Sequence, residues 1–94
     1  MSTSHQEATT LINEGARHHL AGDLLAAQQK YKAAIAVDAE NATAHNNLGF
    51  VLSQQQDYEG ALPVLETAVG LNPESVSAHI NIGNVYLATQ VYDK

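Results

Sequence analysis

The sequence repeats itself every 34 residues, and this repeat constrains the fold more than any other feature. Asn-Leu-Gly at 47–49 recurs as Asn-Ile-Gly at 81–83, and the offset is 81 − 47 = 34. The same shift in the other direction reaches Asn13-Glu14-Gly15. A fixed period of this length indicates a stack of equal supersecondary units rather than one irregular globule. Other residues agree in the same register: Ala27 with Ala61, Ala34 with Ala68, Asp23 with Asp57, His45 with His79, and Tyr58 with Tyr92.

The register divides the chain into a first repeat at 8–41, a second at 42–75 and a partial third at 76–94. Each complete unit reads as helix, turn, helix, and Leu48, Val51 and Leu52 recur at helical spacing. The segment from Ser4 to Glu7 reads as a capping box. We therefore predict helices at about 5–20, 24–37, 42–55, 58–71 and 76–89. N-cap residues stand ahead of the later four, at Asp23, Asn41, Asp57 and Ser75.

A glycine recurs in the middle of the first helix of each unit. Such a residue costs about 1 kcal/mol relative to alanine, so its repetition indicates that another helix approaches closely there. We expect Ala27 and Ala61 to supply the matching small surface on the second helices. Pro63 lies inside the predicted helix at 58–71, where it removes one backbone hydrogen bond. We expect that helix to be the weakest of the complete ones. The glycines are Gly15, Gly49 and Gly83.

Small residues at positions 8, 20 and 27 of a 34-residue unit, with Gly-Asp or Gln-Asp at positions 15 and 16, resemble the tetratricopeptide repeat (TPR). Pro73 at position 32 agrees, whereas the first unit has Ala39 there. The resemblance runs from about Ala8 to Tyr92. It implies an all-α fold, a right-handed α-solenoid of TPR helical hairpins with about two and a half repeats and five helices. We expect residues 1–94 to form a single TPR domain, the N-terminal part of a longer protein.

Composition excludes several classes of function. The formal charge of −6 comes from ten acidic and four basic residues, which disfavours nucleic acid and an anionic membrane surface as partners. There is no cysteine, and therefore no disulfide or thiolate chemistry. The N-terminus shows neither the basic nor the apolar part of a signal peptide. We expect a cytoplasmic protein that binds a protein or peptide.

In the TPR family, positions 2, 5, 6, 9, 12 and 13 of each first helix point into a concave groove, and the resemblance carries this role to 18 residues here. They are Thr9, Ile12, Asn13, Ala16, His19, Leu20, Thr43, Asn46, Asn47, Phe50, Ser53, Gln54, Ser77, Ile80, Asn81, Asn84, Leu87 and Ala88. None is charged unless His19 is protonated. Those predicted to bind a partner are Asn13, Asn47, Asn81, Phe50, Asn46, Asn84, Ile80 and Gln54.

Position 6 is asparagine in all three units, at Asn13, Asn47 and Asn81. An amide offers a donor and an acceptor and suits a peptide backbone, and the pattern is similar to the asparagine ladder of O-linked N-acetylglucosamine transferases. The alternative is that asparagine is simply common at this position and stays solvated. Chaperone-adaptor TPRs instead clamp a peptide carboxylate with Lys and Arg. Of that set this chain keeps only Asn47, because Ile12, Ser77 and Asn81 carry no positive charge.

No catalytic residue, metal site or cofactor site is predicted. The serines lie in no Gly-x-Ser-x-Gly context and the chain has no phosphate-binding loop. His45 and His79 occupy equivalent positions on neighbouring hairpins, too far apart to share a metal easily, so packed or surface histidines are expected. The tyrosines, including Tyr92, lie at repeat-packing positions and are expected to be structural.

Three functions follow, in order of preference. The first is a non-catalytic module that binds a peptide segment of a partner protein in the concave groove. The second is the N-terminal TPR region of a larger cytoplasmic enzyme, similar to a glycosyl- or methyltransferase. The third is self-assembly into a homo-oligomer through the C-terminal helix, because the incomplete third repeat leaves Ile82, Val85 and Tyr86 less covered.

Overall fold

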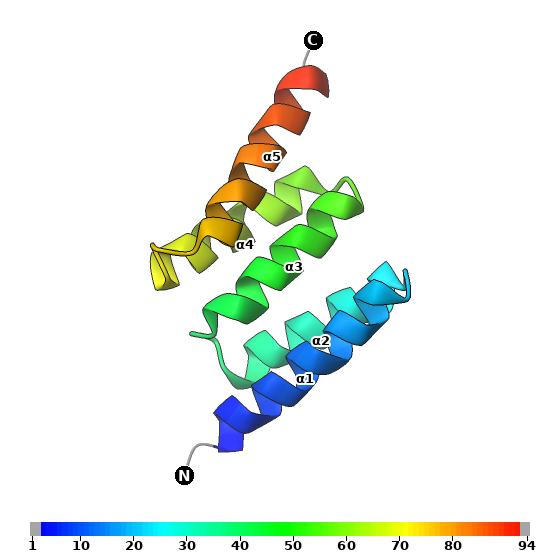
Figure 1. Cartoon of the computed structure of the whole chain (residues 1–94), viewed down its shortest axis with the longest axis vertical. Coiled ribbons are helices and arrows are strands. Elements are labelled where there is room, and N and C mark those ends of the chain that lie inside the picture. Colours follow the sequence, from blue (N-terminus) through cyan, green and yellow to red (C-terminus); the bar gives the residue numbers. More distant parts are fainter. Residues whose placement is uncertain (1–2, 93–94) are drawn as a thin grey trace.

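Five α-helices make up the fold in a computed structural model that describes residues 3–92, with side chains up to residue 90. No strand occurs within that range. Each boundary lies within about three residues of its predicted place, so the expectation of an all-α stack of hairpins is confirmed (Figure 1). No helix in the described range is long and apolar enough to cross a membrane. The helices are α1 (Thr3–Leu20), α2 (Leu24–Val37), α3 (Ala42–Gln54), α4 (Tyr58–Leu71) and α5 (Val76–Tyr92).

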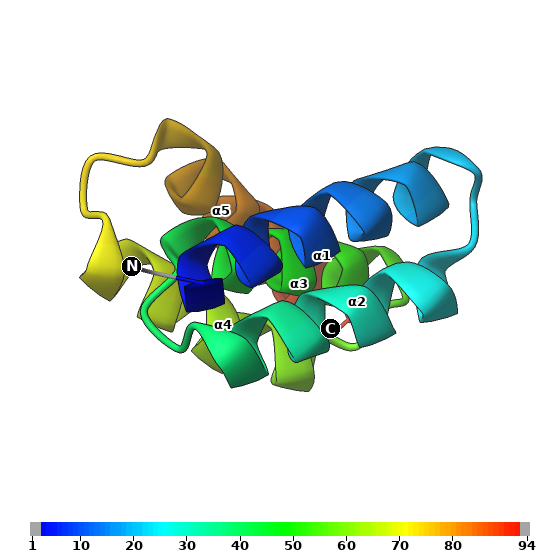
Figure 2. The same ribbon diagram turned by 90° about the horizontal axis from the view of Figure 1, so that it is seen from below.

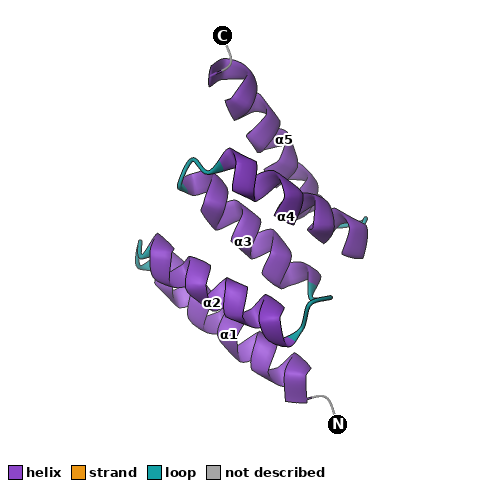
Figure 3. Ribbon diagram, turned by 180° about the vertical axis from the view of Figure 1, so that it is seen from behind, coloured by secondary structure: helices purple, strands orange, loops and turns teal. Residues whose placement is uncertain are grey.

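The helices form two layers that differ in how closely their members approach. Each helix packs against the next along the chain, which makes the hairpins α1–α2 and α3–α4. In addition, α1 lies close to α3 and α3 lies close to α5, whereas no Cα atoms of α2 and α4 come within 8 Å of each other (Figures 1 and 3). A stack whose first helices touch and whose second helices are apart curves with the first helices on the inside. The surface of α1, α3 and α5 is therefore the inner face of the stack.

Side-chain caps start the last four helices where the sequence predicts them. The carboxylates of Asp23 and Asp57 accept from the backbone N–H of Ala26 and Gly60, at 3.2 and 3.0 Å. Asn41 Oδ1 and Ser75 Oγ accept in the same way from Ala44 and Ala78, at 3.1 and 3.2 Å. These bonds satisfy donors that the first turn of a helix leaves unpaired.

The predicted capping box at the N-terminus is wrong. The first helix already includes Thr3, so Ser4 lies within the helix and cannot be its N-cap. Ser-x-x-Glu spacing also occurs within helices, so the spacing alone does not mark the residue at which a helix begins.

Each hairpin has one turn between its two helices, and each of these turns contains a residue with a left-handed backbone conformation. After α1, Gly22 has φ +83°, and its N–H donates to the carbonyl of His19 while Asp23 donates to that of His18. After α3, Gln56 takes the same place with φ +65°. Glycine accepts this conformation without a Cβ clash, so Gln56 makes the same turn with more backbone strain.

Large side chains, and not the alanines that we expected, fill the space above the first two glycines. A Cβ built on Gly15 would lie 2.5 Å from Cε1 of Tyr31, and one built on Gly49 would overlap the Leu65 side chain. Tyr31 and Leu65 are 1% and 0% exposed. The close approach of the two helices is confirmed, but its purpose is to seat a large residue of the second helix on the backbone of the first. Ala27 and Ala61 are buried elsewhere in the same core.

Helix α4 runs without a break through Pro63, whose place in the helix removes one N–H donor. The hydroxyl of Thr67 donates to the Pro63 carbonyl at 3.0 Å, one turn further on. That this helix is the weakest of the complete ones stays a prediction.

Within the described residues, α5 packs only against α3 and α4. Val85 and Ala78 are buried against the second hairpin, at 1% and 0% exposed. The expectation that Val85 would be uncovered is wrong, because it lies on the side of α5 that joins the core of the preceding hairpin. Tyr86 is 47% exposed, as predicted, and a Cβ added to Gly83 would have no neighbouring atom within 4 Å.

Candidate functional site

The inner face is the surface that the sequence predicts as the binding site, and α1, α3 and α5 run side by side along it (Figure 1). Its polar and aromatic groups meet at two joints between neighbouring helices. At the first joint, between α1 and α3, the imidazole Nε2 of His19 hydrogen-bonds Gln54 Oε1. The His19 and Phe50 rings also pack at a centroid distance of 5.2 Å and an angle of 51°. The first joint therefore brings the rings of His19 and Phe50 together beside the side-chain amide of Gln54.

The second joint, between α3 and α5, is a chain of side-chain hydrogen bonds. Asn81 Nδ2 donates to Asn46 Oδ1 at 2.8 Å, and Asn46 Nδ2 donates to Ser77 Oγ at 3.0 Å. The Asn46 amide therefore uses both its donor and its acceptor within the protein. Because Asn81 is only 8% exposed, this pairing satisfies an amide that burial would otherwise leave unpaired.

The three asparagines at position 6 lie in three different environments. The Asn13 side chain is exposed. Asn47 is half-buried and hydrogen-bonds the Tyr31 hydroxyl, and Asn81 is buried against Asn46. An evenly spaced ladder of three free amides is thus absent from this face as it stands, and Asn13 is the member with an accessible amide. Whether any of them binds a partner stays a prediction.

The exposed part of the inner face combines apolar surface with uncharged polar groups. Phe50 is 39% exposed, Ile80 56% and Leu87 63%. Asn84 and Gln54 are also exposed. Apart from His19, the 18 predicted inner-face residues include no ionisable side chain. The face can therefore offer hydrogen bonds and apolar contact, but no charge-assisted bond to an anion.

Two histidines hold the turns between repeats, a role that the sequence analysis did not predict. The imidazole Nε2 of His45 lies 2.9 Å from the Ala39 carbonyl, and that of His79 lies 2.9 Å from the Pro73 carbonyl. A carbonyl only accepts, so Nε2 carries the proton and donates in both. The signal in the sequence was the 34-residue spacing of His45 and His79.

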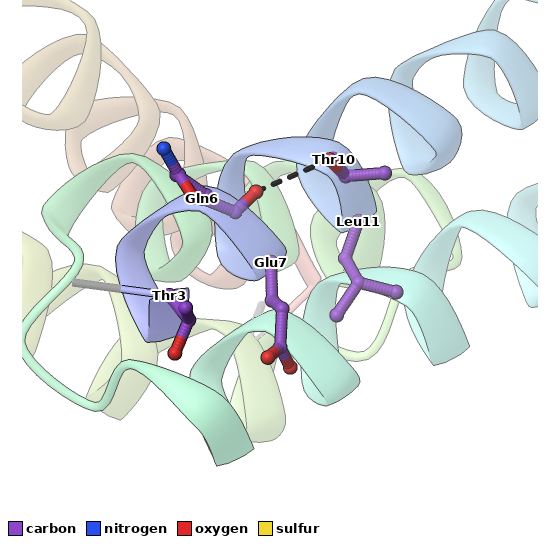
Figure 4. A pocket seen from close by; sticks show the side chains of 5 residues that line it. All are labelled: Thr3, Gln6, Glu7, Thr10 and Leu11. Carbon is purple, nitrogen blue, oxygen red and sulfur yellow. Dashed lines mark hydrogen bonds between the residues drawn. The ribbon is translucent and has the colours of Figure 1, made fainter. Parts of the chain in front are cut away.

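A hollow of about 490 Å³ lies outside the inner face, along the first turns of α1 (Figure 4). None of the predicted inner-face residues lines it. Gln6 and Thr10 are joined there by a 3.1 Å hydrogen bond from the Thr10 hydroxyl to the Gln6 carbonyl. Figure 2 shows that α1 borders the N-terminal end of the stack. The lining residues are Thr3, Gln6, Glu7, Thr10 and Leu11.

Burial changes the acidity of one side chain near this face. It raises the pKa of the Tyr31 hydroxyl above its ordinary value of 10.0, and the hydrogen bond from Asn47 opposes this in part. The neutral phenol is thereby the form that the folded chain favours. No group of three or more His, Cys, Asp or Glu that could hold a metal occurs among the described residues.

Comparison with known proteins decides the family. A family model described as TPR repeat matches residues 15–56 and 51–90, which together cover most of the chain. The chain belongs to the TPR repeat family. The predicted resemblance is therefore confirmed.

Curated relatives of this TPR chain are much longer proteins. It is 32% identical over 56 residues to "Protein O-mannosyl-transferase TMTC3" of Homo sapiens, and equally to that of Mus musculus. The identity to "Protein O-mannosyl-transferase Tmtc3" of Drosophila melanogaster is 30% over 56 residues. Each match covers 60% of this chain and 6% of the relative. The chain therefore corresponds to a small part of these proteins.

Two solved TPR structures have the same arrangement of helices. The first TPR of Spaghetti (RPAP3), bound to the HSP90 peptide SRMEEVD, has a TM-score of 0.85 at 17% identity, and the match covers 88% of this chain and 66% of that one. A mutant O-GlcNAc transferase of Thermobaculum terrenum has a TM-score of 0.88 at 26% identity. That match covers 94% of this TPR chain and 17% of the transferase.

Proposed function

We propose that this chain is a non-catalytic module that binds a peptide segment of a partner protein on its inner face. The observation that carries the proposal is the composition of that face, where exposed Asn13, Asn84 and Phe50 lie on neighbouring first helices. An extended peptide offers backbone donors and acceptors that amides can pair with, and an aromatic surface can take an apolar side chain. The solved TPR neighbour with a bound HSP90 peptide supports a peptide ligand.

The chemistry of the face favours an uncharged or basic peptide over an acidic one. The peptide of that neighbour, SRMEEVD, is rich in carboxylates. Here Ile12, Ser77 and Asn81 stand where adaptor TPRs have cations, and the chain has a formal charge of −6. Acidic peptides would gain no charge-assisted bond and would meet like charge at longer range.

A library of linear peptides displayed on phage and selected on the immobilised chain would test the proposal. We expect selected peptides to be poor in Asp and Glu, and to bind Asn13→Ala or Phe50→Ala about tenfold more weakly. Asn13 is a better probe than Asn47, because Asn47→Ala also removes the hydrogen bond to buried Tyr31. Gln29→Ala, at an exposed site on α2, is the matched control.

Two results would contradict parts of this proposal. If peptides bind Asn13→Ala and Phe50→Ala as tightly as the original chain, the inner face is not the binding surface. If Phe50→Ala abolishes binding while Asn13→Ala leaves it unchanged, the ligand is held by an apolar anchor and the amides contribute nothing. The thermal unfolding midpoint of each variant must stay near that of the unchanged chain for either conclusion.

A second candidate function is that of a TPR region within a larger transferase. The relatives favour it, since the human protein and the Thermobaculum protein are both transferases of which this chain matches only a small part. An antibody raised against residues 3–92 would test it by immunoblotting of the native cells. A band far above 10.0 kDa is expected, and a band at that mass contradicts the idea. Cell fractionation with the same antibody would check the cytoplasmic location, which stays a prediction.

A further inference from the structure

The first joint of the inner face combines a partly open aromatic ring with a nitrogen that has an unused lone pair. Phe50 packs on His19 yet stays 39% exposed, so part of its ring meets solvent. His19 donates from Nε2 to Gln54 Oε1, because an amide oxygen only accepts. The other ring nitrogen, Nδ1, is an acceptor in the neutral imidazole, and no hydrogen bond within residues 3–90 reaches it.

Gln54 fixes the direction of that acceptor. Phe50 and Gln54 are four residues apart on α3 and therefore share one face of the helix. His19 of α1 contacts both of them. Because Nε2 is turned towards Gln54, Nδ1 points away from it. The centroids of the two rings are 5.2 Å apart, so one planar ligand group can lie on the Phe50 ring and donate to Nδ1 at the same time.

The second joint has no comparable pair of groups. Asn46 uses both its donor and its acceptor within the protein, and Asn81 is buried against it. A shift of 34 residues turns His19 and Phe50 into Ser53 and Asn84, neither of which has a ring. Among the 18 predicted inner-face residues, the ring pair therefore occurs once, and it marks one position of a bound peptide rather than a repeating one.

We propose that the first joint takes an arginine side chain of the bound peptide, with its guanidinium on the Phe50 ring and one N–H donated to His19 Nδ1. The proposal rests on the peptide-binding function proposed above and names the class of peptide. A guanidinium is planar, stacks on aromatic rings and has five N–H donors. A cation is attracted to an aromatic ring within about 6 Å of its centroid, which keeps the donor within reach of the neighbouring imidazole.

The charges around the joint agree with a cationic ligand group. The chain has a formal charge of −6, which attracts cations over a long range. Helix α3 contains no Lys or Arg that would repel a guanidinium. On α1, Arg17 is two residues from His19 and therefore points to another side of the helix. A carboxylate in the same place would meet the lone pair of Nδ1 instead of a donor.

Three capped peptides that differ in one side chain test the proposal. They are acetyl-Gly-Arg-Gly-amide and its counterparts with glutamine and glutamate, each titrated into the isotope-labelled chain and followed by NMR chemical shifts. Phe50→Leu keeps an apolar side chain without an aromatic ring, and His19→Phe keeps a ring without an acceptor nitrogen. Gln29→Ala, at an exposed site on α2, is the matched control. Circular dichroism checks that each variant is folded.

We expect the arginine peptide to shift the signals of His19, Phe50 and their neighbours, and to bind about tenfold more tightly than the glutamine peptide, as a cation–π contact with one hydrogen bond implies. The glutamate peptide should bind most weakly. Phe50→Leu and His19→Phe should each remove most of the preference for arginine, whereas Gln29→Ala should keep it.

Three results would overturn the proposal. If the three peptides bind at the joint with equal affinity, the inner face binds peptides without selecting arginine, so the proposed function stands and this inference fails. If the preference for arginine survives in both variants, or if the shifts lie away from the joint, the cation is attracted by the overall charge alone. If no peptide causes a shift, the joint is not a binding subsite, and the library selection decides separately whether the inner face binds longer peptides.

Discussion

Gly49 and Gly83 occupy the same position of successive repeats, yet one lies in a packed core and the other beside open space. Above Gly49 the Leu65 side chain leaves no room for a methyl, whereas nothing lies within 4 Å of a Cβ at Gly83. The sequence around them is nearly the same, Asn-Leu-Gly against Asn-Ile-Gly. The difference comes from the second helix, because Leu65 of α4 packs on Gly49, whereas none of the described residues packs on Gly83. The contribution of a residue at a given repeat position to stability therefore depends on the side chains that pack against it.

The largest expected difference in stability is between alanine substitutions of one leucine in the second hairpin and one leucine on α5. Leu65→Ala should lower the free energy of unfolding by about 2–5 kcal/mol, because it removes a fully buried side chain and leaves a cavity above Gly49. Leu87→Ala, at a residue on α5 that is 63% exposed, should change it by less than about 0.5 kcal/mol. Urea denaturation followed by circular dichroism, at concentrations low enough to keep the chain monomeric, measures both.

That comparison fails if the two leucines respond alike. A loss at Leu87 as large as that at Leu65 would mean that α5 is covered by something that acts even at low concentration. A small loss at Leu65 would mean that the second hairpin relaxes around the deleted side chain, and that its packing is looser than its burial implies.

Adding one methyl to each glycine should change stability in opposite directions. Gly49→Ala forces Leu65 to shift within a buried site, and overpacking of this kind costs about 1–3 kcal/mol. Gly83→Ala should stabilise the monomer by about 0.5–1 kcal/mol, because alanine favours the helix and its methyl meets nothing. Thermal unfolding midpoints of the two variants in dilute solution give the signs directly. A destabilised Gly83→Ala monomer would contradict the open environment of that residue.

The fold could be predicted from the sequence because its local signals agree with each other. Asp23, Asn41 and Asp57 accept the hydrogen bonds that an N-cap accepts, and the 34-residue period places them correctly. Ser4 misled the prediction, because the pattern of a capping box says nothing about where the preceding backbone becomes helical. The glycines predicted a close approach of helices, but the sequence could not tell that Tyr31 and Leu65 would fill it.

The candidate site was less predictable because it depends on contacts between helices that are distant in sequence. Asn13, Asn47 and Asn81 look equivalent in the sequence, yet Asn81 is buried by its bond to Asn46. Asn46 stands where the other two repeats have isoleucine, so the bond belongs to one joint only. Such a difference arises from the residue on the neighbouring helix, and the period of a repeat does not report it.

The smallest expected effect concerns Tyr31, whose position in the first hairpin corresponds to that of Leu65 in the second. Unlike leucine, tyrosine can lose a proton. Burial raises the pKa of Tyr31 in the folded chain above the 10.0 of an ordinary tyrosine. Above about pH 10 the unfolded chain therefore releases a proton that the folded chain keeps. The unfolded state then binds fewer protons, so stability falls as the pH rises towards the folded pKa, and the contribution is intact below pH 10.

Tyr31→Phe should flatten this alkaline loss in urea denaturation measured at a series of pH values. At neutral pH the variant should lose only about 1 kcal/mol, the contribution of the hydrogen bond with Asn47. Asn47→Ala provides the opposite change, because it removes the bond that partly lowers the pKa and so extends the loss to higher pH. An unchanged alkaline slope in Tyr31→Phe would show that the ring above Gly15 is not the group that titrates, and the contrast between the two hairpins would then rest on packing alone.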